Sequence, residues 1–154
     1  MTPELIYWDS DAFLGWLQNE AGKEHLCRAT FERAEKGEVL LVTSALTVAE
    51  VLWTRNTPKI SKDRATLVRR FFRRSYIRVR GVSRAIAECA QDVVWDHSIM
   101  PKDAIHVATA IDAKVKVLET FDKGLLTKSG TVGSPPLIIR MPQPSRQGSL
   151  DLGR

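Results

Sequence analysis

The sequence predicts an α/β sandwich with a mostly parallel central sheet of four or five strands, flanked by helices. Short apolar runs of strand length alternate with longer segments of helical periodicity, which is the pattern of parallel βαβ units. The chain has 154 residues, of which 44% are hydrophobic and 27% are charged. This size and composition are typical of one soluble domain with a sizeable core.

The first half of the chain contains two predicted strands and four predicted helices. The strands are continuously apolar and cover residues 5–8 and 39–43. The helices are expected at residues 11–20, 24–36, 45–55 and 62–73. Gly37 favours the end of the second helix, and Ser44 and Ser61 are expected to cap the third and the fourth.

The second half continues the alternation of strands and helices. Strands are expected at residues 76–79, 115–120 and 137–139, and helices at 84–96, 101–113 and directly after Asp122. Ser83 is a good cap for the first of these helices, and Pro101 suits the first turn of the second. Residues 1–140 are therefore predicted to form a single domain. Residues 141–154, with two prolines and two glycines, are predicted to be a flexible tail.

The chain shows no sign of a membrane or secretory segment. It has no apolar run of transmembrane length, and its start lacks a basic segment followed by a long apolar one. A cytoplasmic location is therefore expected. Cys27 and Cys89 lack the spacing of a zinc or redox motif, so both are interpreted as small buried thiols.

Residues 55–84 carry a strong excess of positive charge. They contain eleven Lys or Arg residues and a single acid, whereas the whole chain, with 23 basic and 18 acidic residues, has a net charge of +5. A basic segment within an otherwise acidic chain indicates a polyanionic partner, and arginine suits phosphate oxygens. The aromatic residues Phe71, Phe72 and Tyr76 either stack on nucleic-acid bases or belong to the core. The candidate RNA contacts are Arg69, Arg73 and Arg80.

Four carboxylates lie near the predicted ends of strands or starts of helices, each within apolar sequence: Asp9, Glu50, Asp103 and Asp122. Burying a carboxylate is costly unless it is paired, neutralised or bound to a metal. Ligand sites of parallel sheets lie beyond the carboxyl ends of the strands, where Asp9 and Asp122 are expected. Four acids at one edge would repel each other unless a divalent cation lay among them. The sequence therefore predicts a metal-dependent enzyme.

Three of these acids also have a structural explanation. Asp9, Asp103 and Asp122 lie where an acid stabilises the N-terminus of a helix. Ser10 and Asp11 are available to cap the helix after the first strand, so Asp9 is not needed for that role. Both interpretations stay open for each acid when it is considered alone.

Glu50 is placed inside a predicted helix, on a largely apolar face with Leu46 and Trp53. The alternative to a metal ligand is a buried ion pair with one of the arginines. Thr120 is expected to hydrogen-bond a ligand carboxylate or a metal-bound water. His106 is expected to have at most a minor role in orienting a neighbouring group.

The order and context of the acids resemble the PIN-domain family and, within it, VapC-type toxin ribonucleases. The resemblance rests on the segments 6–10, 47–51, 103–110 and 120–122, and it covers about residues 5–140. It implies a PIN-like sandwich and an endoribonuclease that depends on Mg²⁺ or Mn²⁺. It implies that the catalytic metal ligands are Asp9, Glu50, Asp103 and Asp122, with Thr120 and Ser10 as auxiliary residues.

The same resemblance implies a toxin of a type II toxin–antitoxin pair, usually a homodimer, that hydrolyses RNA and is held inactive by a cognate antitoxin. The chain departs from the family pattern at Asp11, in the arginine-rich segment and in its long tail. These departures concern the substrate and the partner rather than the class of nuclease.

Two other functions fit parts of the sequence. In a haloacid-dehalogenase-like phosphatase, Asp9 would form an aspartyl-phosphate and Asp11 would act as acid and base. That scheme also needs a late acidic pair, which the sequence lacks, and it leaves Glu50 unexplained. In a non-catalytic RNA- or protein-binding module, the acids would form structural ion pairs.

Overall fold

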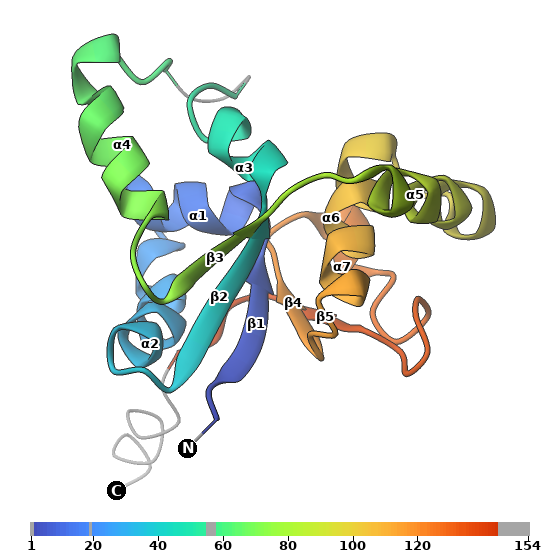
Figure 1. Ribbon diagram of the computed structural model, residues 1–154. Coiled ribbons are helices and arrows are strands. Elements are labelled where there is room, and N and C mark those ends of the chain that lie inside the picture. The colour runs from blue at the N-terminus through green and yellow to red at the C-terminus, as the bar shows by residue number, and fades with distance from the viewer. Residues whose placement is uncertain (1, 19, 55–57, 145–154) are drawn as a thin grey trace, which may run out of the picture.

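The centre of the molecule is a five-stranded sheet in which all strands run parallel, in the order β3-β2-β1-β4-β5. The computed structural model describes residues 2–18, 20–54 and 58–144. The strands are β1 (Glu4–Trp8), β2 (Val39–Ser44), β3 (Ile77–Arg80), β4 (Val117–Glu119) and β5 (Ile138–Arg140). Ile6 of β1 is in register with Leu41 of β2 on one side and Val117 of β4 on the other. The predicted fold class is confirmed, with five strands (Figure 1).

Helices cover both faces of this sheet (Figure 1). They are α1 (Ser10–Leu17), α2 (Glu24–Glu35), α3 (Ala45–Glu50), α4 (Ala65–Phe72), α5 (Arg84–His97), α6 (Pro101–Asp112) and α7 (Lys123–Leu126), with a short 3₁₀ helix, η1, at Lys62–Arg64. Helices α1, α2 and α4 pack on one face, and α5, α6 and α7 pack on the other. The arrangement is a three-layer sandwich.

Strand β1 shows how the sequence divides the core into two parts. Its side chains alternate between the two faces, as in any strand. Tyr7 packs with the cluster under α5, α6 and α7, whereas Ile6 and Trp8 pack with the cluster under α1, α2 and α4. All three are fully buried, because a central strand of a parallel sheet is covered on both faces.

The aromatic residues beside the basic segment belong to this core. Phe71 and Phe72 are buried and lie against Phe13, with ring centroids 5.9 and 5.3 Å from its ring. Stacking on nucleic-acid bases, one of the two interpretations left open, is therefore excluded for these two rings. Tyr76 is half-buried, and its hydroxyl accepts a hydrogen bond from Arg74.

Several predicted boundaries need correction. The helix predicted over residues 45–55 ends at Glu50, because the chain continues in tighter turns. There the backbone N–H groups of Leu52 and Trp53 donate to the carbonyl oxygens of Ala49 and Glu50, three residues back. Residue 55, its predicted end, lies outside the described residues. The strand predicted over 115–120 is only Val117–Glu119 long. Ser44 and Ser83 cap α3 and α5 as predicted.

The prediction of two buried thiols is correct for Cys27 only. Cys27 is buried and Cys89 half-buried, and burial raises the pKa of both thiols.

Residues 141–144 form no regular element, although Pro142 is buried, and the rest of the predicted tail lies outside the described residues. Within the described ranges, no helix has both the length and the apolar character needed to span a membrane.

A buried acid that sequence reasoning did not single out connects four elements. Glu119 of β4 is fully buried, and its Oε1 accepts hydrogen bonds from Trp8 Nε1 (2.8 Å) and from Thr30 Oγ1 (2.9 Å). Its Oε2 accepts from Nε and Nη2 of Arg140, both at 3.3 Å. Each oxygen thus has donors, so the charge of Glu119 is compensated within the protein.

We therefore expect Glu119→Ala to lower the free energy of unfolding by about 3–5 kcal/mol, because it leaves three donor groups, one of them charged, without their acceptor. The measurement is equilibrium unfolding in urea. The matched control is Glu88→Ala, which removes an exposed ion pair with Arg84 and should change the free energy by less than about 1 kcal/mol. Equal effects of the two substitutions would contradict this account of the buried network.

Candidate active site

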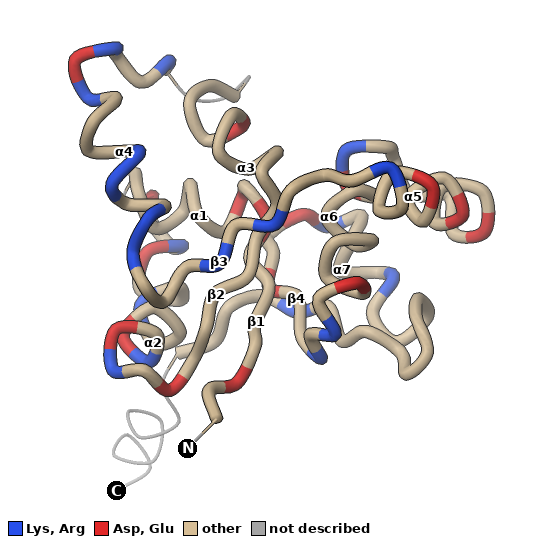
Figure 2. Tube along the Cα trace, in the orientation of Figure 1, with Lys and Arg blue, Asp and Glu red and all other residues tan. Residues whose placement is uncertain are grey.

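The carboxyl ends of β1, β2 and β4 meet at one edge of the sheet, and the predicted acids are arranged around it. Asp9 directly follows β1, and Asp122 follows β4 at the start of α7. Glu50 is the last residue of α3, the helix after β2, and Asp103 lies in the first turn of α6. Figure 2 shows the acidic positions of α1, α3 and α6 near one another beside this edge.

Asp9 is the most buried of the four, with 2% of its surface exposed. Its Oδ1 accepts a hydrogen bond from the backbone N–H of Ala12 (3.1 Å), and its Oδ2 accepts one from the hydroxyl of Thr120. Asp9 is therefore the N-cap of α1, and the expectation that Ser10 or Asp11 would take that role is wrong. The reason is that the extended backbone at Asp9 directs its own side chain over the first turn of the helix.

Two of the acids resist ionisation because of where they lie. Burial raises the pKa of Asp9 to about 7, and the charge of Asp11 adds to the shift, while His106 and the donors on Asp9 oppose it. Burial raises the pKa of Asp103 to about 6, with a further contribution from the charge of Asp122. Such shifts arise where carboxylates share a site without a compensating cation.

Thr120 joins the end of β4 to the end of β1. Its hydroxyl donates to Asp9 Oδ2 and accepts a hydrogen bond from the backbone N–H of Asp122 (3.0 Å). Asp122 in turn caps α7, because its Oδ1 accepts from the backbone N–H of Leu125 (2.9 Å). The predicted hydrogen bond from Thr120 to an acid of the site is thus present, and Asp122 has the capping role considered for it.

Glu50 is held by a histidine rather than by an arginine. His106 is buried on α6, and its Nε2 lies 2.8 Å from Oε1 of Glu50, while its Nδ1 lies 2.7 Å from the hydroxyl of Tyr7. With Glu50 ionised, Nε2 carries the hydrogen and donates it to the carboxylate. Burial, and secondarily the charge of Asp9, raises the pKa of Tyr7, so the phenol stays neutral. Sequence reasoning gave His106 only a minor role and missed Tyr7.

Asp11 is a further acid of this group that sequence reasoning treated only as a cap or as part of a phosphatase. Burial raises its pKa, as do the charges of Asp122 and Glu50, while Lys23 opposes the shift. The spacing Asp9-Ser10-Asp11 could have revealed this acid, because the start of α1 brings Asp11 to the same edge of the sheet as Asp9. Ser10, the predicted auxiliary residue, is half-buried between them.

The donor chemistry of this group suits a hard divalent cation, since all five acids offer carboxylate oxygens. In the part of the chain that the structure describes, however, no three His, Cys, Asp or Glu side chains already form a group that could hold a metal ion. Asp9, Asp122 and Glu50 are instead turned toward donors of the protein itself. Their assignment as metal ligands therefore stays a prediction.

The predicted RNA-contacting arginines lie on the surface of the basic segment. Arg69 and Arg73 are exposed on or next to α4, and Arg80 is exposed at the end of β3, in register with Ser44 at the end of β2. Arg80 also forms an ion pair with Asp112 of α6. Figure 2 shows that basic positions follow α4 and β3 along one side of the molecule.

Comparison with known proteins gives one family and several structures. The model of the PIN domain matches residues 6–129. No curated protein matches the chain. Mycobacterium tuberculosis VapC20, described as a sarcin–ricin loop cleaving toxin, has a similar structure, with a TM-score of 0.61, 15% sequence identity and coverage of 77% of this chain and 90% of that chain.

Two further structures resemble this fold. A toxin–antitoxin complex from Klebsiella pneumoniae gives a TM-score of 0.59 at 16% identity, covering 91% of this chain and 99% of that chain. FitAcB from Neisseria gonorrhoeae gives a TM-score of 0.59 at 16% identity, covering 89% of this chain and 97% of that chain. At such identities the likeness concerns the fold alone.

The raised pKa values lead to an expected dependence of stability on pH. Between about pH 7 and pH 4 the folded protein holds a proton on Asp9 that the unfolded chain releases, because the folded pKa is about 7 and the ordinary value is 3.8. In EDTA, the stability contributed by this group should therefore be present at low pH and be lost as the pH rises toward 7. The raised pKa of Asp103 should also make the folded protein less stable as the pH rises.

The measurement is the free energy of unfolding in urea at several pH values from 5 to 8, on the order of one pH unit apart. Asp9→Asn should reduce the decline of stability with rising pH. An Asp9→Asn variant whose pH dependence equals that of the unaltered protein would show that Asp9 is not the group responsible.

Proposed function

Because the chain belongs to the PIN domain family, we propose that it is a metal-dependent endoribonuclease and the toxin of a type II toxin–antitoxin pair. The observation that supports this most is the group of acids beside β1, β2 and β4, in which burial and mutual repulsion raise the pKa values of Asp9 and Asp103. The structural acid Glu119 forms an ion pair with Arg140, whereas among the described residues neither Asp9 nor Asp103 forms an ion pair with a lysine or an arginine.

In this proposal Asp9, Glu50 and Asp103 hold a Mg²⁺ or Mn²⁺ ion, and Asp122 completes the site or orients the attacking water. The cation would offset the repulsion between these carboxylates. When bound, the ion activates a water for attack and neutralises charge on the scissile phosphate. Hydrolysis of an RNA phosphodiester bond then requires no covalent intermediate on the protein.

The neighbouring side chains position these acids. Thr120 holds one oxygen of Asp9 at the end of β1, and His106 holds one oxygen of Glu50 at the end of α3. Both contacts restrict rotation of a carboxylate before a cation arrives. Hydrogen bonds from neighbouring side chains commonly fix the orientation of metal ligands.

The partners follow from charge and from the similar structures. The arginines of α4 and β3 are suited to hold an RNA backbone, and Arg69, Arg73 and Arg80 are our candidates. A toxin–antitoxin complex is among the similar structures, so we propose a cognate antitoxin that supplies a basic side chain to the acidic site. We also propose a homodimer, as the family resemblance implies.

The phosphatase alternative fits this structure less well. A nucleophilic aspartate must be reachable by its substrate, but Asp9 is almost fully buried and each of its oxygens already accepts a hydrogen bond. The nuclease proposal uses Asp9 without requiring covalent attack, and it also gives Glu50 and the basic segment a role.

We expect Asp9→Asn and Asp103→Asn each to lower the rate of RNA cleavage by about 100-fold or more, because each removes a proposed metal ligand. Cleavage of transfer, ribosomal and messenger RNA is measured with Mg²⁺, with Mn²⁺ and with EDTA. EDTA should abolish cleavage by the unaltered protein. The matched control is Asp96→Asn, an exposed acid of α5, which should leave cleavage unchanged.

Full activity of both Asp9→Asn and Asp103→Asn, or unchanged RNA cleavage in EDTA, would refute the proposed function. Circular dichroism and thermal unfolding of each variant show whether a loss of activity reflects a loss of the fold. Cleavage of a generic phosphomonoester in preference to RNA would favour the phosphatase instead.

We expect His106→Ala to weaken Mn²⁺ binding by about tenfold, because Glu50 loses the donor that fixes it. Isothermal titration calorimetry measures the affinity. His106→Gln, whose amide can still donate toward Glu50, should restore most of it, and the exposed His25→Ala is the control. If His106→Ala binds Mn²⁺ as tightly as the unaltered protein, His106 has no positioning role.

A further inference from the structure

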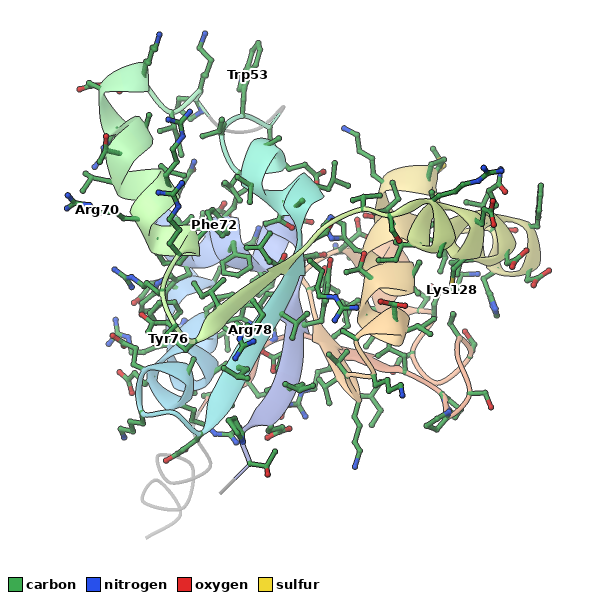
Figure 3. All side chains as sticks on the ribbon, in the orientation of Figure 1. Trp53, Arg70, Phe72, Tyr76, Arg78 and Lys128 are labelled. Atoms are coloured by element: carbon green, nitrogen blue, oxygen red, sulfur yellow. The ribbon has the colours of Figure 1, made fainter. Side chains whose placement is uncertain are left out.

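An exposed tryptophan stands beside the acidic site. Trp53 follows α3 by three residues, and 67% of its surface is exposed. Figure 3 shows its side chain projecting from the end of α3, away from the sheet. A large aromatic ring that contributes so little to the core is free to contact a partner.

The ring of Trp53 forms one wall of a cavity that also contains residues of the site. This open cavity has a volume of about 770 Å³. Its lining includes Trp53, Leu46, Glu50, Ser10, Asp11 and Lys102. Lys102 directly precedes Asp103 on α6, so the cavity leads from the indole ring to the acids. Its volume suits a group of the size of a nucleotide.

Positive charge lies over the ring and in the cavity beside it. The ammonium group of Lys59 lies over the indole, 5.7 Å from the ring centroid. Lys102 lines the same cavity, and the basic positions of α4 and β3 continue along the neighbouring surface (Figure 2). An exposed aromatic ring with ammonium groups nearby matches a nucleotide, because the base stacks on the ring while the phosphate attracts the cations.

We propose, on the basis of the proposed function, that Trp53 forms a base-binding subsite that stacks an unpaired base of the RNA next to the bond that is cut. Lys102 contacts the phosphate on the path from that base to the acids. A base inside a duplex cannot lie flat on the indole, so the subsite selects RNA that is single-stranded at this point.

The other strongly exposed tryptophan supplies a contrast. Trp95 is 72% exposed on α5, where the adjacent cavity is lined by apolar residues such as Val94, Pro101 and Ile105. The Trp95 cavity contains neither a lysine nor an acid of the site. Charge complementarity to RNA therefore distinguishes the Trp53 cavity, and Trp95 serves as the matched control.

The experiment measures RNA binding separately from cleavage. Asp103→Asn provides a background that does not cleave, and into it Trp53→Ala, Trp53→Phe, Trp95→Ala or Lys102→Ala is introduced. The probe is a fluorescently labelled, unpaired RNA of about ten nucleotides, compared with the same backbone lacking bases and with the corresponding duplex. Fluorescence anisotropy gives each dissociation constant, and circular dichroism verifies the fold of each variant.

We expect Trp53→Ala to weaken binding of the unpaired RNA by about tenfold or more, and Trp53→Phe to retain most of the affinity. Trp95→Ala should have no effect. The RNA without bases should bind the background protein as weakly as intact RNA binds Trp53→Ala. Lys102→Ala should weaken binding of both RNAs and lower the salt slope by about one.

Unchanged binding by Trp53→Ala, or equal binding of RNA with and without bases, would overturn the proposal. A Trp53→Ala variant that loses binding of a co-expressed antitoxin but retains RNA binding would show that the subsite recognises protein instead, which also overturns it. Absence of RNA cleavage by the unaltered protein would contradict the proposed function, whereas the comparison of Trp53 with Trp95 would still report on the subsite.

Discussion

Repulsion between carboxylates at the carboxyl edge of the sheet is the constraint on which the site depends. Parallel strands β1, β2 and β4 end at the same edge, and the helices that follow or precede them bring further acids to it. Among the residues that the structure describes, no lysine or arginine forms an ion pair with Asp9 or Asp103. Burial raises the pKa of both carboxyl groups, and the charges of neighbouring acids raise it further. A site of this kind gains stability from any cation that enters it.

Two buried acids near the end of β4, Glu119 and Asp9, differ in how their charge is compensated. Glu119 and Thr120 are adjacent, yet they face different layers of the sandwich. Glu119 is satisfied by Trp8, Thr30 and Arg140, and it connects β1, α2 and β5 to β4. Thr120 instead donates to Asp9, which forms no ion pair with a lysine or an arginine in the described ranges. The contrast separates an acid whose charge is compensated within the fold from the acids that we propose as metal ligands.

Much of the architecture could be predicted from sequence because the signals were local. The apolar runs of β1 and β2 and the caps Ser44 and Ser83 are visible in short windows, and parallel strands imply that acids at their ends meet. The end of α3 was missed, because the apolar sequence continues past Glu50 although the helix does not. The hydrogen-bond partners of His106 could not be predicted either, since Tyr7 and Glu50 lie 99 and 56 positions away along the chain.

The most direct test of this account is a crystal structure of the protein grown with Mn²⁺, in which anomalous scattering locates the ion. We predict a manganese peak bound by carboxylate oxygens of Asp9, Glu50 and Asp103, with Thr120 and His106 still holding Asp9 and Glu50. A structure at saturating Mn²⁺ with no peak at this edge, or with a peak that these three carboxylates do not contact, would contradict it.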